Sequence, residues 1–226
     1  MKKNNKIMKT SAVLVVIALL TAWGANGIYA KYVTDGEQED AARVASWGVV
    51  MEPNSEGTFS ATYAKDDTNY TLGDNSVIAT SENKVVAPGT NGTFKGLKVS
   101  GTPEVAVKIT NEGTVTLTGW TVSKAYYCPL KVTVGTTELY GLDYTTADAF
   151  ANAIAAEIAK VTSYQTPGTD LEKATGVVPE VTWEWPFEGD NGSKVTRTDE
   201  KDTALANLET APTVNIKIKT TVTQVN

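Results

Sequence analysis

Short runs of alternating apolar and polar residues fill most of this sequence, and they restrict the chain to a β fold. Successive side chains of a strand point to opposite faces, so a run with one apolar face indicates a half-buried strand. Turn-forming clusters separate the runs. The strongest is Ala87–Gly92, where Pro88 presets φ and Gly89 can take the positive φ of a type II turn. Many short strands joined by turns indicate a mainly β chain, a β-sandwich and most simply a jelly roll, with one or two helical insertions. The predicted strands are Arg43–Met51, Thr58–Tyr63, Asn69–Leu72, Val77–Thr80, Thr93–Val99, Glu104–Asn111, Thr114–Val122, Tyr126–Val134, Val181–Phe187 and Thr213–Val225.

One segment has helical periodicity instead. Ala147–Val161 is rich in alanine, and its large apolar residues recur at the spacing of one helical face. Thr145 or Thr146 is a candidate N-cap, because a hydroxyl can accept a hydrogen bond from the first turn. We expect this helix to cover one edge or end of the β core, and Asp202–Leu208 to form a short helical turn. The apolar face consists of Phe150, Ile154, Ile158 and Val161.

The first thirty residues have the order of a secretory signal peptide. A lysine-rich start precedes the apolar run Ala12–Trp23, and a polar stretch begins after Ala30. The run has 12 residues, whereas a membrane-spanning helix needs about 20; an uncleaved anchor is the alternative. We expect cleavage between Ala30 and Lys31, which leaves 196 of the 226 residues. That length suits one domain of residues 43–226 preceded by a flexible arm of residues 31–42.

The composition excludes several classes of function. Without the leader's four lysines the chain has 16 basic and 26 acidic side chains, so its net charge is −10 rather than −6. This balance argues against nucleic acid as a partner, because phosphate contacts need clustered basic residues. The chain has no histidine, which removes serine–histidine–aspartate and cysteine–histidine catalysis and the HExxH zinc motif. We therefore expect no catalytic residues, no cofactor and no structural metal.

Cys128 is the only cysteine, so no disulfide can form within one chain. Its neighbours are apolar, which favours a buried and inert thiol over a reactive one.

Three possible sites have simpler structural interpretations. Glu184 and Glu188 flank aromatic residues, as a glycosidase pair could, but strand alternation places Glu184 opposite the aromatic face. Trp183, Trp185 and Phe187 share that face and could form a sugar-stacking platform, although such a stripe is more often core. The loop from Asp190 to Asp202 has oxygen ligands for calcium but lacks the spacing of a calcium loop, so a solvated loop is the default.

Several motifs, in their order along the chain, resemble the TasA/camelysin family of secreted biofilm-matrix proteins. Gly27–Tyr32 is similar to the junction that a SipW-type signal peptidase cleaves in that family, and Ala42–Val49 resembles the family's first mature strand. Val86–Phe94, followed by Val107–Glu112, resembles a core pattern with Pro-Gly, Gly-x-Phe and Asn-x-Gly. Thr182–Phe187 and the segments Asp202–Leu205 and Val222–Val225 are similar to the ending of clostridial relatives.

The resemblance implies a jelly-roll protein at the cell surface or in the biofilm matrix of a Gram-positive bacterium, with subunits that polymerise into fibres. In that family the N-terminal arm of one subunit can complete a sheet of the next. Some camelysins are described as metalloproteases, but this chain has no histidine, so we do not expect that activity. The expected partner is the chain itself, with accessory matrix or anchoring proteins, and no nucleic acid or small-molecule substrate. The residues expected to drive assembly are Tyr32, Val33, Val44, Trp47 and Val49.

Two other functions stay open. The runner-up is a monomeric cell-surface binding module for a glycan or a host protein, and an enzyme is third. Imaging and ultracentrifugation of a chain that begins at Lys31 would separate a fibre subunit from a monomeric module.

Overall fold

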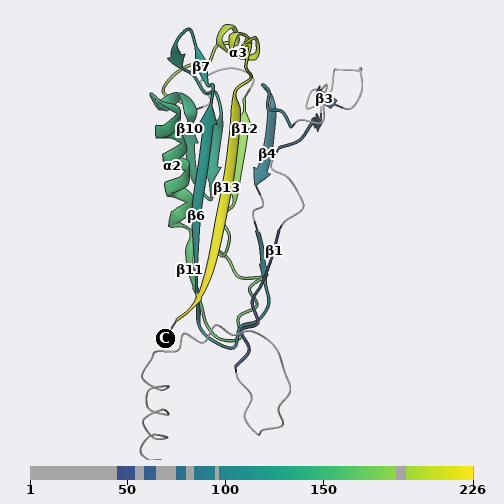
Figure 1. The fold of residues 1–226 in the computed structure, drawn as a ribbon, viewed down its shortest axis with the longest axis vertical. Coiled ribbons are helices and arrows are strands. Elements are labelled where there is room, and N and C mark those ends of the chain that lie inside the picture. Colours follow the sequence, from purple (N-terminus) through teal and green to yellow (C-terminus); the bar gives the residue numbers. More distant parts are fainter. Residues whose placement is uncertain are drawn as a thin grey trace, which may run out of the picture. The chain divides into compact units, whose positions relative to one another are not determined.

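The computed structural model describes residues 45–53, 59–64, 75–79, 84–94, 97–186 and 192–225, all of them within one unit, Val44–Asn226. The chain is mainly β, as predicted, with two larger sheets and two α-helices in the described part (Figure 1). The predicted signal peptide, its cleavage site at Ala30 and Lys31, and the arm with Tyr32, Val33 and Val44 lie outside the described residues.

The first larger sheet has the strand order β11-β6-β13. Its two long strands, β6 and β13, pair in antiparallel register over twelve residues, from Thr213 opposite Thr118 to Gln224 opposite Val107. The prediction of β13 is confirmed, and its larger apolar residues share one face with buried Ile218 and Thr220. The bounds are β6 Val107–Thr118, β11 Thr162–Gln165 and β13 Thr213–Gln224.

The second larger sheet has the order β10-β9-β12-β4, again antiparallel. The predicted turn before β4 is present: Thr90 N donates to Ala87 O over 3.0 Å, and Gly89 has a φ of 81°. The Pro88–Gly89 corner thus sets where the strand begins. The bounds are β4 Thr90–Phe94, β9 Lys131–Val134, β10 Thr137–Tyr140 and β12 Val181–Trp185.

Three two-stranded sheets complete the strands of the described residues. They pair β1 with β5, β2 with β3 and β7 with β8, and a short 3-10 helix, η1, spans Gly141–Asp143. Their bounds are β1 Val50–Pro53, β2 Thr62–Ala64, β3 Asn75–Ile78, β5 Leu97–Ser100, β7 Thr121–Val122 and β8 Ala125–Tyr126.

The alanine-rich segment is a helix, as predicted. Helix α2 spans Ala147–Lys160, and Thr146 caps it by accepting a hydrogen bond from Ala149 N over 3.1 Å. It runs alongside β6 and also contacts β9 and β10 (Figure 1). The expectation that it covers one edge or end of the β core agrees with its contact with the edge strand β10. Helix α2 also packs closely on β6, where Gly113 has no side chain. A second helix, α3, spans Asp199–Ala206, where a helical turn was predicted.

Two buried clusters hold the unit together. The larger one joins both large sheets and α2, and it contains Leu117, Trp120, Val132, Phe150, Ile154, Ile158, Val181, Trp183, Trp185 and Ile218. The smaller one lies where β6 begins and contains Val99, Val107, Ile109, Leu171 and Val177. The two clusters therefore lie toward opposite ends of β6.

Several predicted strands have different bounds in the structure. The first was expected over Arg43–Met51, but Gly48 has a φ of 56° and breaks the extended chain, so β1 begins at Val50. The run Thr93–Val99 is divided between β4 and β5, which belong to different sheets. The run Glu104–Asn111 and the first part of the run Thr114–Val122 merge into β6, because Gly113 continues the strand, whereas Thr121–Val122 forms β7.

The run Tyr126–Val134 is likewise divided, between β8 and β9. Pro129 was expected at an edge or a bulge; it lies in the buried connection between these two strands instead. A proline cannot donate to a sheet ladder, so the ladder stops before it and resumes at Lys131.

Candidate functional site: an apolar groove between two strand edges

Within the described part of the unit, two strand edges that border one cavity have no partner strand. Among the described residues, β4 pairs only with β12 and β13 pairs only with β6, so each strand has one side without a partner. Helix α2 lies at the other side, where it contacts β10 and β9. Outward-pointing N–H and C=O groups on an open edge form a template for another strand.

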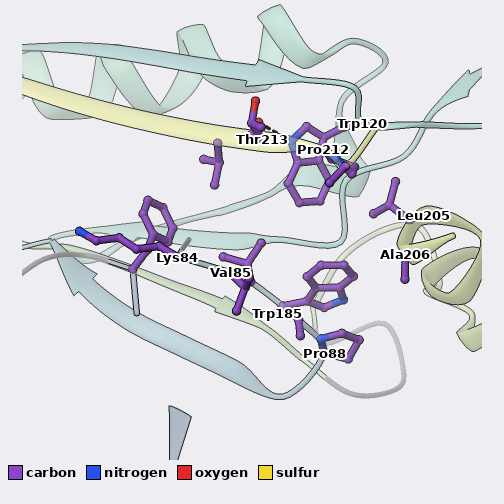
Figure 2. Close-up of a pocket in the computed structure, with 14 residues that line it drawn as sticks. Lys84, Val85, Pro88, Trp120, Trp185, Leu205, Ala206, Pro212 and Thr213 are labelled. Carbon is purple, nitrogen blue, oxygen red and sulfur yellow. Dashed lines mark hydrogen bonds between the residues drawn. The ribbon is translucent and has the colours of Figure 1, made fainter. Parts of the chain in front are cut away.

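An apolar cavity of about 800 Å³ lies between these two edges. One wall is the segment that leads into β4, and the other is the segment that leads into β13 (Figure 2). Side chains from both sheets and from α3 point into it, including Val85, Val86, Trp120, Trp185, Leu205, Pro212 and Val214. We call this cavity and the two open edges beside it the groove.

Trp120 and Trp185 form the deepest part of the groove. Their ring centroids are 5.9 Å apart with planes tilted by 57°, and only 2% and 4% of the two residues is exposed. Trp120 Nε1 donates to Thr213 O over 2.8 Å, and Trp185 Nε1 donates to Asp202 Oδ2 over 3.3 Å. Each indole nitrogen has an acceptor, so neither ring leaves an unpaired polar group beside the groove.

Asp202 ties helix α3 to this floor. The carboxylate is buried, and its Oδ1 accepts a hydrogen bond from the Tyr127 hydroxyl over 2.6 Å. Arg197 Nη1 lies 3.9 Å from Oδ2 and balances the negative charge. Burial, and then the hydrogen bond to Asp202, raise the pKa of the Tyr127 phenol, which therefore acts as a donor. Helix α3, which supplies Leu205 and Ala206 to the groove, is held in place by this network.

The aromatic stripe of the sequence belongs to the core. Trp183 and Trp185 are buried, so the structure favours the core over an exposed sugar-stacking platform for these two residues. Phe187 and Glu188 lie outside the described residues. Glu184 faces away from the tryptophans, as expected, and its carboxylate lies 3.4 Å from Lys131 Nζ. The part that Trp120 plays in the groove was not predicted, because residues 119–120 looked like the continuation of a strand.

Two of the candidate calcium ligands in the loop from Asp190 to Asp202 form hydrogen bonds with other protein groups. The Asp202 carboxylate accepts hydrogen bonds from Tyr127 and Trp185, and the Ser193 hydroxyl donates to Asp143 Oδ1 over 3.0 Å. Asp199 is exposed in the first turn of α3, and Asp190 and Asn191 lie outside the described residues. Within the described ranges, no group of three or more acidic or cysteine side chains is arranged to hold a metal ion.

The base of the predicted assembly arm packs in its own subunit. Trp47 and Val49 are partly buried against the smaller cluster. Glu104 fixes the same segment, because its carboxylate accepts a hydrogen bond from Ser46 N over 2.8 Å and its N–H donates to Ser46 O over 3.1 Å. The chain therefore enters the described unit at the end of β6 that is far from the groove.

Cys128 is fully buried, and burial raises the pKa of its thiol to about 12. The predicted burial of Cys128 is confirmed, and a buried thiol with a raised pKa is expected to be unreactive.

Within the described ranges, neither helix combines the length and the apolar character that a membrane crossing requires. Comparison of the chain with models of known protein families, with curated proteins and with solved structures gave no match.

Proposed function

We propose that this protein is a secreted structural subunit with a jelly-roll-like sandwich, and that it polymerises into fibres of the extracellular matrix or cell surface by N-terminal donor-strand exchange. The observation that carries the proposal is the apolar groove between the open edges of β4 and β13. The partner is a second copy of the chain, with accessory or anchoring proteins at fibre ends, and neither nucleic acid nor a small-molecule substrate takes part.

A donated strand suits both features of the groove. Its backbone N–H and C=O groups would pair with an open edge, and its inward side chains would fill the cavity between the sheets. A long, flat, open edge is uncommon in a protein that stays monomeric. Strand β13 has such an edge: its register with β6 runs without a bulge over twelve residues, and it contains no proline.

The positions of the arm and the groove favour an open fibre over a closed dimer. The arm begins next to Trp47 and Val49, at the Val107 end of β6, whereas the groove lies beside Trp120, just past the other end. Ile109 and Leu117, eight residues apart along β6, are separated by roughly 26 Å. A contact between two different surfaces repeats from copy to copy and produces a filament when it does not close into a ring.

The sequence supports the same proposal. The leader would keep the arm blocked until a signal peptidase releases Lys31, which would couple secretion to assembly. The resemblance to the TasA/camelysin family implies the same location and the same kind of fibre. The alternative, a monomeric surface binding module, would use the groove for a strand of a host protein; the burial of Trp183 and Trp185 makes a glycan platform there less favourable.

The test compares two untagged chains after prolonged incubation. The chain that begins at Lys31 should form fibres in negative-stain images and sediment as a polymer. The chain that lacks residues 31–40 should stay folded by circular dichroism and sediment as a monomer. Fibres from both chains would refute strand donation by this arm, and a long-lived monomer from the complete mature chain would refute the fibre subunit itself.

A further inference from the structure

We propose that the arm of one subunit pairs with the open edge of β13 in the next subunit, rather than with that of β4, and that a ladder of opposite charges selects this edge. In the ladder, Asp35, Glu37 and Glu39 of the arm lie beside Lys217 and Lys219 of β13. The inference rests on the proposed function, and it adds which edge receives the strand and what excludes wrong pairings.

The length of the arm matches β13 and not β4. Fourteen residues, 31–44, separate the expected cleavage site from the first described residue, Ala45, and fully extended they span about 46–50 Å. Strand β13 has twelve residues and β4 has five, which correspond to roughly 41 Å and 17 Å of edge. Pairing with β13 therefore engages most of the backbone groups of the arm, whereas pairing with β4 engages fewer than half of them.

The solvent-facing side of β13 and its neighbour β6 is basic. Lys217 and Lys219 are two residues apart on β13, so they point to the same face, and both are exposed. Lys108 of β6 adds a third cation to this face, because it lies opposite Thr223. The only acidic residue of the two strands is Glu112, whose carboxylate lies 3.9 Å from Lys219 Nζ. The side chains of Lys219 and Glu112 are 69% and 73% exposed, so Lys219 stays accessible to a second carboxylate.

The edge of β4 offers no comparable charge. None of its five residues, Thr90–Phe94, is charged, and the neighbouring strand β12 presents Glu184 on its solvent-facing side. Lys131, on the next strand β9, lies 2.7 Å from Glu138 and 3.4 Å from Glu184. An acidic strand beside β4 would thus meet no cation on that strand, so the two open edges differ in charge as well as in length.

The arm has the matching charges at the matching spacing. Asp35, Glu37 and Glu39 occur at every second residue, so an extended arm places all three carboxylates on one face. Neighbouring strands lie about 4.8 Å apart, which brings facing side chains together. Opposite charges on facing residues stabilise a pair of strands, whereas like charges destabilise it.

The same lysines exclude a competing contact. Two copies of β13 could pair edge to edge and form a closed dimer, but this pairing would bring Lys217 and Lys219 of one copy beside those of the other. Like charges at this distance repel, and lysines on an open strand commonly prevent edge-to-edge association. An acidic arm is therefore favoured where a second β13 edge is disfavoured, and this difference supports head-to-tail growth.

The first test reverses the charges on one side of the ladder at a time. The arm-reversed chain, with Glu37→Lys and Glu39→Lys, should raise the critical concentration for fibre formation about tenfold, because attraction becomes repulsion. These substitutions make each subunit less negative, so general repulsion between subunits cannot explain a loss of assembly.

The edge-reversed chain, with Lys217→Glu and Lys219→Glu, should show a similar loss. Both side chains are exposed, so the fold should be retained, which circular dichroism verifies. Lys173→Glu with Lys194→Glu is the matched control, because it changes the net charge equally at exposed loop positions and should assemble much better than the edge-reversed chain. Unchanged critical concentrations in both reversed chains would overturn the inference.

Restoring the ladder gives the sharpest result. A chain with all four reversals has the original net charge and should assemble at nearly the critical concentration of the unsubstituted chain. An equimolar mixture of the arm-reversed and edge-reversed chains should also form fibres, because each arm then meets an oppositely charged edge in the other chain. Rescue by the fourfold variant without rescue by the mixture would show that the arm pairs within its own subunit and would overturn the inference.

Hydrogen exchange tests the choice of edge without any substitution. When the unsubstituted mature chain assembles, the amides of β13 that point away from β6 should gain protection, and those of β4 should not. Protection of β4 instead of β13 would overturn the inference. The two failures are distinguishable: if the unsubstituted mature chain forms no fibres, the proposed function fails and the inference with it, whereas fibres that are insensitive to charge reversal refute only the ladder on β13.

Discussion

At the scale of single residues, one buried carboxylate supports the floor of the groove. Asp202 accepts hydrogen bonds from Tyr127 and Trp185 and lies beside the Arg197 guanidinium. A buried charge is stable only when it is paired and hydrogen-bonded, so the buried Asp202 carboxylate depends on Tyr127, Trp185 and Arg197. The indole of Trp185 therefore keeps one orientation toward the groove.

Asp202→Ala should lower the free energy of unfolding by about 3 kcal/mol, because two buried donors and a buried guanidinium lose an acceptor. Urea unfolding followed by tryptophan fluorescence measures the loss. Thr203→Ala, at an exposed position of the same helix, is the control and should change stability by less than about 0.5 kcal/mol. Comparable stability of the two variants would show that the network adds nothing to the fold.

Cys128 should make the folded chain less stable in alkali. Burial raises the pKa of its thiol from 9.0 to about 12, so the folded chain keeps the proton while the unfolded chain releases it above about pH 9. The contribution of the thiol is complete below about pH 9 and is lost as the pH rises from there toward 12. Urea midpoints measured between about pH 8 and 10.5 should fall less steeply for Cys128→Ala than for the unsubstituted chain.

The comparison isolates the thiol because Tyr126 and Tyr127, whose pKa values burial also raises, are present in both proteins. Parallel pH profiles would contradict the assignment. The native thiol should also resist a thiol reagent until the chain is denatured.

At the scale of elements, the contact between α2 and β6 depends on one glycine. A Cβ at Gly113 would lie 2.8 Å from Ile158 Cδ1 and 3.1 Å from Ala155 Cα, closer than packed carbon atoms allow. Asn111, on the same face of β6, donates to Val161 O and Val177 O and accepts from the Thr220 hydroxyl. The helix end, the loop before β12 and strand β13 are thus fixed to one strand.

Gly113→Val should lower the free energy of unfolding by about 1–3 kcal/mol, because the added methyl groups force α2 away from β6. Thr114→Val is the control, since Thr114 is exposed on the opposite face of the same strand and valine suits a strand. Thermal unfolding of both variants gives the comparison. A Gly113→Val chain as stable as the control would show that α2 does not require this close approach.

At the scale of the whole molecule, the described unit has an arm base at one end of β6 and an open groove at the other. Among the described residues, the edges of β4 and β13 beside the groove have no partner strand, and a donated strand would pair with one of them. The stability of a subunit in a fibre therefore includes that of its contact with the next subunit.

A synthetic peptide of residues 31–44 should inhibit polymerisation of the mature chain when it is in excess, because it occupies the groove without offering a groove of its own. The length distribution of fibres in negative-stain images, and the lag before light scattering rises, measure the effect. A peptide of the same composition in scrambled order is the control. Inhibition by both peptides, or by neither, would contradict occupation of the groove by the arm.

The sequence by itself determined the local structure that depends on spacing along the chain. Helix α2 and its Thr146 cap, the Pro88–Gly89 turn, strand β13 and the apolar face of β12 follow from periodicity and from backbone preferences, which act within a few residues. The burial of Cys128 followed from its apolar neighbours. The mainly β class followed from the number of alternating runs.

Only the tertiary structure decided where those runs end and what they enclose. Gly48 and Gly113 look alike in the sequence, yet Gly48 breaks a strand with a positive φ, whereas Gly113 continues one so that α2 can approach it. Trp120 and Trp185 are far apart in the sequence and meet because β6 and β12 belong to two sheets that share one core. The groove depends on the contact between these two tryptophans and on which strands have no neighbouring strand. Both are set by contacts between residues far apart in the sequence, and such contacts leave no periodic pattern in the chain.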